Sequence, residues 1–329
     1  FHARVGMMDV KVARIEQLAV EIAKAVGYGD EASVRRASQL CKADLTSGMV
    51  GEFPELQGIM GRYYALAQGE PSIIAEAIYE HYKPQGAGDD LPKTELGAII
   101  AVADKLDSII SLFAAGEKPT GSKDPLALRR AALGALRIIL ANDWPLDLLA
   151  LEVKPEVILF FEDRLRASLL DEKINHGCID AILDDRTART IAFGAAFVPR
   201  ALVLQAHSLQ EWLSTDSGTA TLAAIKRTLN ILAAEEKKAK TTFAPALASS
   251  LAAPAEKALA EALTALTPHL TSADEAQRLA ALASLAAPIQ QFFTDLLVTE
   301  EGFREARLGL LAAVRDAACK IADFSKIEG

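Results

Sequence analysis

The stretch VARIEQLAVEIAKAVG at residues 12–27 repeats apolar side chains three and four positions apart and ends on a glycine. This spacing places the apolar side chains on one face of an α-helix, and glycine is a common helix stop. The same rhythm returns near the end of the chain, at Leu310, Val314, Ala317, Ile321 and Phe324. Alternation with period two, which is typical of half-buried strands, is scarce. The sequence therefore predicts an all-α fold with little or no sheet.

The composition is that of a folded protein without a membrane span. The chain has 329 residues, of which 51% are hydrophobic and 6% are aromatic. This apolar content excludes collagen-like and disordered chains, and no segment has the ~20 consecutive apolar residues of a transmembrane helix. The three cysteines form no CxxC pair, which favours a reducing compartment. We expect a cytoplasmic protein and, because the chain begins at Phe1, a piece of a longer one.

Breaks in the helical pattern suggest two domains. Loops rich in glycine, proline and charge occur at residues 51–54, 83–92 and 116–125. The tetrapeptide NDWP at residues 142–145 indicates a further break, from which we expect domains at 1–150 and 151–329. Both halves are acidic and share the formal net charge of −9. Any binding of nucleic acid must therefore depend on local basic clusters.

One basic cluster lies in the loop around residue 120 and at the start of the next helix. It consists of Lys118, Lys123, Arg129 and Arg130. Lysines and backbone amides in such a loop can bind phosphate. A solvated loop that caps the helix with Asp124 is the alternative, and spacing alone leaves both open.

A second cluster lies on a predicted helix at residues 222–240. Lys226, Arg227 and Asn230 fall outside its apolar stripe. Two cations and an amide near one face suit an RNA backbone and base edges. Arg304 and Arg307 beside the C-terminal stripe offer the same chemistry. For all five residues an ordinary solvated helix face is the alternative.

Histidines and acidic residues of the chain are possible metal ligands. Helical proteins build metal sites from imidazoles and carboxylates, and the candidates are His2, Asp44, His81, Asp104 and Asp107. A capping or ion-paired role is the alternative for Asp104, since an unpaired buried carboxylate is costly. The end of a helix is the alternative for His81. No GxSxG and no GxxxxGK[ST] sequence occurs, so nucleophilic catalysis and a Walker-type phosphate loop have no support.

Several longer strings carry a family resemblance. They are CKADL (41–45), MVGEFPELQGIMG (49–61), EHY (80–82), GDDLP (88–92), ADKLD (103–107), the segment 118–130, PIQQFF (288–293) and ADFSKI (322–327). Together they resemble the β subunit of the bacterial two-subunit glycyl-tRNA synthetase over nearly the whole chain, with a weaker match at 184–221.

The resemblance implies a fold, a function and partners. The chain would be roughly the C-terminal half of the β subunit, with a helical HD-like domain at 1–150. A helical linker and an anticodon-binding domain of the arginyl-tRNA synthetase type would follow at 151–329. In that family two α and two β subunits form a heterotetramer, and the α subunit binds ATP and Mg²⁺ and catalyses glycylation. We therefore expect a non-catalytic fragment that binds glycine tRNA, the α subunit and no cofactor of its own.

The HD resemblance also bears on the metal candidates. HD phosphohydrolases hold metal with a histidine, a His-Asp pair and a final aspartate. The resemblance matches His2, Asp44 and Asp104 to this set, while Ala43 replaces the histidine of the pair. Loss of an imidazole predicts a degenerate site without a tightly bound metal, with His81 as a further remnant. An HD-type, metal-dependent nucleotide phosphohydrolase is the alternative function, and a helical scaffold that binds no RNA is a third.

The family pattern ranks the basic residues as well. It implies that Lys226, Arg227 and Asn230 lie on a helix near the anticodon, followed by Arg304 and Arg307. The cluster at Lys118, Lys123, Arg129 and Arg130 would face the acceptor side of the tRNA or the α subunit.

Overall fold

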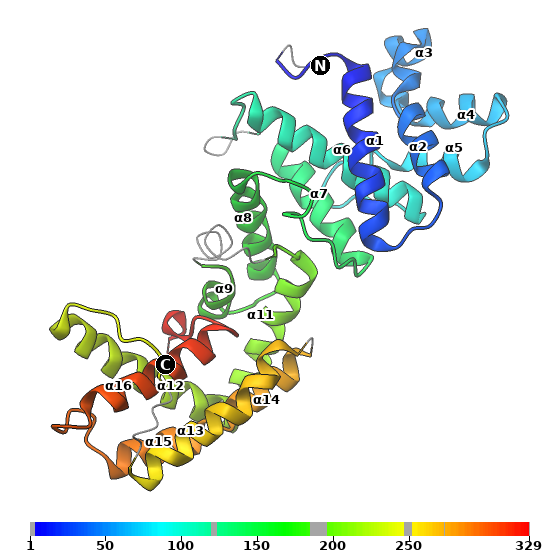
Figure 1. Ribbon diagram of the computed structural model, residues 1–329. Coiled ribbons are helices and arrows are strands. Elements are labelled where there is room, and N and C mark those ends of the chain that lie inside the picture. Colours follow the sequence, from blue (N-terminus) through cyan, green and yellow to red (C-terminus); the bar gives the residue numbers. More distant parts are fainter. Residues whose placement is uncertain (1–3, 120–123, 185–195, 247–251, 273, 329) are drawn as a thin grey trace. The chain divides into compact units, whose positions relative to one another are not determined.

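The computed structural model describes residues 4–119, 124–184, 196–246, 252–272 and 274–328 (Figure 1). Throughout these ranges the regular elements are helices, and no strand is present. The predicted all-α fold is confirmed. The described helices include none that is both long enough and apolar enough to cross a bilayer.

The chain divides into two compact units. One contains Phe1–Ser168 and Thr187–Ala201, and the other contains Leu169–Arg186 and Leu202–Gly329. The sequence boundary at residue 150 thus falls inside the first unit. The assignment of an HD-like and an anticodon-binding domain stays a prediction.

The first unit is organised around one buried helix. Its elements are α1 (Met8–Val26), α2 (Glu31–Leu40), η1 (Ala43–Thr46), α3 (Gly48–Glu52), η2 (Pro54–Leu56), α4 (Ile59–Ala67), α5 (Ser72–Glu80), α6 (Glu95–Ala114) and α7 (Leu128–Ala141). Helix α6 packs against α1, α2, α5 and α7. Every residue of α6 from Leu96 to Asp107 is buried, as expected for a helix that is covered on all sides.

Local sequence explains where the first helices begin and end. Helix α1 ends at Gly27, whose φ of 82° is the left-handed conformation that glycine adopts without strain. The side chain of Asp30 accepts a hydrogen bond from the backbone N–H of Ser33 and caps α2. The helix predicted around residues 12–27 and its stop are therefore confirmed.

The second unit is also a packed set of helices. Its elements are α9 (His176–Leu183), α12 (Asp216–Ala239), α13 (Pro254–Leu266), η3 (Thr267–Thr271), α14 (Glu275–Ala283), α15 (Ala286–Asp295), α16 (Arg304–Cys319) and η4 (Phe324–Lys326). Helices α8 (Pro155–Asp171) and α11 (Pro199–Leu213) contribute residues to both units. Helix α12 packs against α14, α15 and α16. It therefore presents only part of its circumference to solvent.

Candidate functional site

The first unit contains a cluster of buried charges on α6. Asp104 is 9% exposed and Asp107 is 2% exposed. The ammonium Nζ of Lys42, from the segment between α2 and η1, lies 2.7 Å from Oδ2 of Asp104. Nζ of Lys11, from α1, lies 2.8 Å from Oδ1 of Asp104 and 3.0 Å from Oδ2 of Asp107. Two lysines from separate helical segments thus converge on the two carboxylates.

His81, directly after α5, completes this cluster. It is fully buried, and its Nδ1 lies 2.6 Å from the carbonyl oxygen of Ile78. A carbonyl only accepts, so Nδ1 carries the proton and Nε2 presents a lone pair. Nζ of Lys42 lies 2.8 Å from that Nε2 and donates to it. Burial and the Lys42 ammonium hold the pKa of His81 well below its usual value, so the imidazole is neutral.

The two hydrogen bonds of His81 resemble the contacts of a metal-bound histidine, except that the Lys42 ammonium takes the place of the metal. A metal ligand also binds through one ring nitrogen while the other donates to a carbonyl or carboxylate. Lys42 supplies a positive charge to the imidazole and to Asp104 at once. Arg14 adds a third cation, with Nε 2.5 Å from Oδ1 of Asp107.

The donor set therefore does not fit a divalent cation. Three cations already surround two carboxylates, and a further cation would be repelled. Among the residues that the structure describes, no group of three or more His, Cys, Asp and Glu side chains could hold a metal. Burial raises the pKa of the adjacent Cys41 thiol to about 12, so this cysteine is no nucleophile.

Asp44 does not join this cluster, contrary to the match made from the resemblance. Its Oδ2 accepts hydrogen bonds from the backbone N–H groups of Gly58 at 2.6 Å and Gly61 at 3.1 Å. Lys42, two residues earlier, occupies the position beside Asp104. His2 lies outside the described residues. Of the candidate metal ligands that the structure describes, His81, Asp104 and Asp107 are therefore brought together, and Lys11 and Lys42 join them.

Sequence reasoning missed Lys11 and Lys42. A signal for Lys11 was present, because it lies four residues before Ile15 on the apolar stripe of α1. A lysine on the buried face of a helix requires a buried acidic partner. Periodicity alone does not identify that partner.

The RNA candidates on α12 lie in the second unit. Arg227 and Asn230 are exposed. The guanidinium carbon of Arg227 lies 4.5 Å from the ring centroid of Phe293 on α15. Beside this pair is a groove of about 260 Å³ between α12 and α15, lined mainly by alanines and by Gln290. Lys226 is half-buried, and its Nζ donates to the carbonyl oxygen of Ile327 at 2.7 Å.

The two candidate arginines of α16, Arg304 and Arg307, are engaged within the fold. Arg307 is 3% exposed, and its guanidinium bonds to Glu256 at 2.7 Å and to Glu300 at 2.6 Å. Arg304 bonds to Glu235 at 2.8 Å, with a third of its side chain exposed. The expectation that Arg307 faces RNA does not agree with its burial, because no phosphate reaches a guanidinium that two carboxylates enclose.

The basic cluster around residue 120 likewise contains both paired and exposed side chains. Asp124 accepts hydrogen bonds from the backbone N–H groups of Leu128 and Arg129, so it caps α7. Nζ of Lys118 lies 2.6 Å from Oε2 of Glu156. Arg129 is half-buried and Arg130 is exposed, while Lys123 lies outside the described residues. The capping alternative accounts for Asp124, and phosphate binding stays a prediction.

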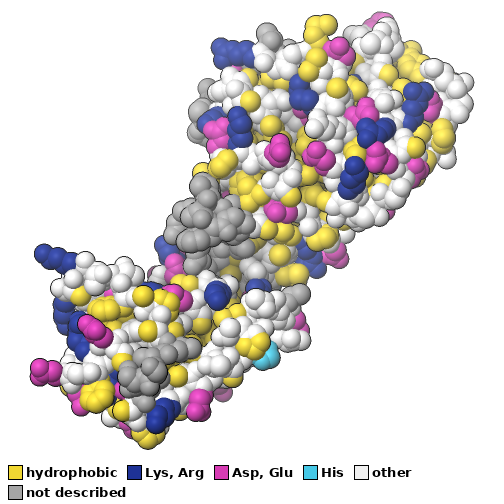
Figure 2. Space-filling view, in the orientation of Figure 1, with side chains coloured by type: hydrophobic (Ala, Val, Ile, Leu, Met, Phe, Trp, Pro, Cys, Tyr) yellow, Lys and Arg dark blue, Asp and Glu magenta, His cyan; other side chains and the backbone are white. Residues whose placement is uncertain are grey.

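On the face drawn in Figure 2, basic and acidic side chains are interspersed over most of the described surface. This distribution agrees with the net charge of −9. A net negative charge repels RNA at long range, so any RNA binding has to depend on a few local contacts.

We expect Lys42→Met to lower the free energy of unfolding by about 3 kcal/mol. This variant keeps the length of the side chain but leaves Asp104 and His81 without the shared cation, and breaking a buried pair is strongly destabilising. Urea denaturation followed by circular dichroism measures the effect. Lys24→Met is the matched control, because Lys24 is 68% exposed. Equal stability of both variants would contradict a structural role for Lys42.

The neutral state of His81 predicts a pH dependence of stability. Because its pKa is lowered in the folded chain, the unfolded chain takes up a proton below about pH 6.5 that the folded chain does not. The free energy of unfolding should then decrease by up to about 1.4 kcal/mol per pH unit below that point. Denaturation at pH 7, 6 and 5 measures the slope. His81→Gln should reduce it, and an unchanged slope would show that other groups cause it.

The comparisons with known proteins give the family. Residues 1–184 match the family model described as glycyl-tRNA synthetase beta subunit. The glycine–tRNA ligase beta subunit of Phenylobacterium zucineum (strain HLK1) is 45% identical over 341 residues. That similarity covers 100% of this chain and 49% of the relative, so the chain spans about half the length of the curated relative it matches. On this evidence, the chain belongs to the glycyl-tRNA synthetase β-subunit family.

Proposed function

We propose that this chain is the C-terminal half of a glycyl-tRNA synthetase β subunit and that it binds glycine tRNA as a non-catalytic part of the enzyme. Family membership carries the proposal. The proposed contact includes the anticodon region and the body of the tRNA. ATP and Mg²⁺ would be bound by the α subunit, and the location would be the cytoplasm.

The exposed side of α12 supports RNA binding by its chemistry. The guanidinium of Arg227 rests on the Phe293 ring and is exposed to solvent. Stacked arginine–aromatic pairs bind unpaired bases and phosphates in single-stranded RNA. Asn230 lies one helical turn further on and offers an amide for base edges. Lys226 is a weaker candidate since its ammonium is held by the Ile327 carbonyl.

The α subunit is the proposed protein partner. The relative's name describes it as a β subunit, and we infer assembly with α subunits in an α2β2 heterotetramer. Exposed large apolar side chains on α3, on α4 and at the residue after α3 support a protein contact there: Met49, Phe53, Ile59, Tyr63 and Leu66 carry 36–60% exposure.

Removal of Arg227 tests the RNA contact. We expect Arg227→Ala to weaken binding of glycine tRNA about tenfold, because stacking contributes roughly 1–3 kcal/mol per base. Fluorescence anisotropy over a salt series measures the affinity. The plot of log affinity against log salt concentration should become shallower by the amount expected for about one lost phosphate contact. Lys257→Ala, which removes another exposed cation of the second unit, is the control. Unchanged affinity in Arg227→Ala would favour the scaffold alternative.

Metal content tests the phosphohydrolase alternative. Because lysines surround Asp104, we expect the purified chain to hold well below one equivalent of Mn, Fe or Zn by atomic emission. A stoichiometric metal together with phosphate release from nucleotides would overturn the assignment of a non-catalytic fragment.

A further inference from the structure

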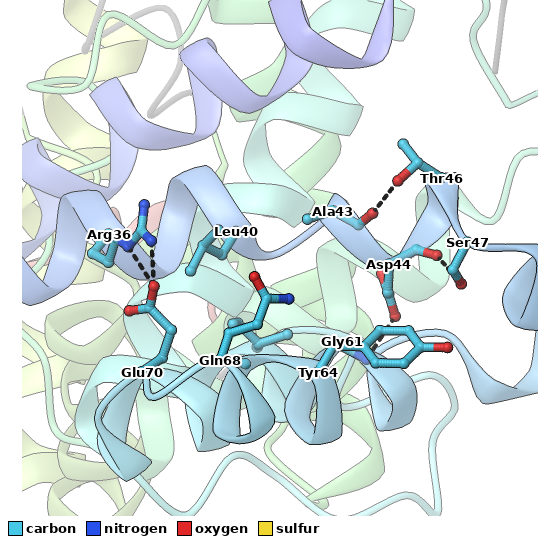
Figure 3. A pocket seen from close by; sticks show the side chains of 12 residues that line it. Arg36, Leu40, Ala43, Asp44, Thr46, Ser47, Gly61, Tyr64, Gln68 and Glu70 are labelled. Atoms are coloured by element: carbon cyan, nitrogen blue, oxygen red, sulfur yellow. Dashed lines mark hydrogen bonds and ion pairs between the residues drawn. The ribbon is translucent and has the colours of Figure 1, made fainter.

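Several cations of this chain are neutralised by a neighbouring carboxylate. Figure 3 shows one example in a cavity of about 300 Å³ that is lined by residues of α2, η1, α4 and α5. Arg36 lines this cavity, and its Nε lies 3.0 Å from Oε1 of Glu70. Arg304 is paired with Glu235 in the same manner. Exposed cations without a carboxylate partner are therefore the ones that remain available to an anion such as a phosphate.

Helix α12 differs in that no acidic residue is exposed between positions 220 and 238, all of which the structure describes. The exposed residues there are alanines, one asparagine and three cations. They are Ala220, Ala223, Arg227, Asn230, Ala233, Ala234, Lys237 and Lys238. We call this set the α12 stripe. In a chain with a net charge of −9, such a face supplies the local positive charge that a polyanion requires.

The two glutamates in this part of α12 are turned away from the exposed face. Glu235 is 5% exposed, with Oε1 2.6 Å from Nζ of Lys238 and Oε2 2.8 Å from the guanidinium of Arg304. Glu236 is half-buried and bonds to Arg315 at 2.9 Å. Both carboxylates are thus held by arginines of α16, and the exposed face of α12 keeps its cations.

The cations of the α12 stripe lie along one side of the helix. Arg227 and Lys238 are eleven residues apart in the sequence, which is about three helical turns and roughly 16 Å along the axis. The side chain of Lys238 is 70% exposed. Arg227 and Lys237 form no ion pair with any described residue. The alanines between these cations leave room for an extended chain of phosphates to approach the helix.

One end of the α12 stripe lies beside the groove between α12 and α15. This groove has a volume of about 260 Å³, and Ala223, Arg227, Gln290 and Phe293 are among its lining residues. The guanidinium of Arg227 stacks on the Phe293 ring, and Gln290 is exposed. A base enters such a groove only when it is unpaired, because a paired base keeps its edge inside a duplex. The groove therefore favours a single strand.

We propose that the α12 stripe binds the sugar–phosphate backbone of an unpaired segment of the bound tRNA, with one base of that segment in the groove between α12 and α15. This proposal rests on the proposed function and adds Lys237 and Lys238 to the RNA contacts. Phosphates lie against the two lysines, while the base meets Arg227 and Gln290. A line of cations that leads to an aromatic stacking surface is the arrangement of sites that bind single-stranded nucleic acid.

An acidic protein segment is the alternative occupant of the α12 stripe. Its carboxylates would pair with Lys237 and Lys238 as phosphates do. Such a segment would leave the groove and the stacked Arg227 without a planar ligand, so the combination of stripe and groove favours RNA.

Neutralising the lysines tests the α12 stripe. We expect Lys237→Gln/Lys238→Gln to weaken binding of glycine tRNA and of a short unpaired RNA about tenfold at low salt, as measured by fluorescence anisotropy. The plot of log affinity against log salt concentration should become shallower by about 1.4, since each phosphate of a single strand contributes about 0.7. Lys173→Gln/Lys257→Gln, at two other exposed lysines of the second unit, changes the net charge equally and is the control.

A second variant separates loss of the contact from loss of the fold. Ala234→Glu places a carboxylate in the α12 stripe four residues before Lys238, and a glutamate at this spacing supports a helix. The affinity for both RNAs should therefore fall several-fold while the midpoint of thermal unfolding does not decrease. Ala258→Glu, at an exposed position of α13, is the matched control and should leave RNA binding unchanged.

The outcomes distinguish this proposal from the proposed function. Failure of the unsubstituted chain to bind glycine tRNA would refute the proposed function. Normal tRNA binding by both stripe variants would refute the α12 stripe as an RNA contact and leave the proposed function intact. Equal affinity for a duplex of the same RNA sequence, or tighter binding of a polyglutamate peptide, would overturn the assignment to single-stranded RNA.

Discussion

The first unit depends on neutralising two carboxylates inside its central helix. Asp104 and Asp107 lie on a part of α6 that is buried on all sides, and removing a charge from water costs several kcal/mol unless a partner compensates. Lys11 on α1 and Lys42 between α2 and η1 supply the compensating charges. The charges therefore specify which neighbours α6 accepts, in addition to the apolar packing. Lys42 also bonds to His81 and so attaches the end of α5 to the same centre.

The same pairing removes the chemistry that the HD resemblance would otherwise imply. A metal site needs ligands with lone pairs directed at an empty position, and here ammonium groups fill that position. His81 retains the hydrogen bond from Nδ1 to a carbonyl that orients metal-bound histidines. The ligand geometry is thus present while the charge balance is that of a structural ion-pair network. Exposed groups such as Arg227 remain accessible to a ligand, unlike the buried residues of this network.

In the second unit, too, burial and the bonding partner distinguish structural cations from cations that could bind RNA. Arg307 is enclosed by Glu256 and Glu300 and connects α16 to α13 and to the segment before α16. Arg227 has an aromatic ring as its contact and is exposed. A cation paired with buried carboxylates stabilises the fold, whereas a cation stacked on a ring keeps its charge available to RNA. Burial and partner, more than charge, decide which arginine can bind a phosphate.

The sequence by itself determined the all-α class, the course of α1 with its stop at Gly27, and the family. These follow from periodicity and local hydrogen bonding, which act over a few residues. Only the tertiary structure decided that Lys42 meets Asp104, that Asp44 turns to Gly58 and Gly61, and that Arg307 is buried. Arg307 and Glu256 are 51 residues apart, and helical spacing indicates the face of a side chain without naming the helix that covers it. The partner of a charged group depends on packing between distant segments, so only the folded structure identifies which residues come together in the site.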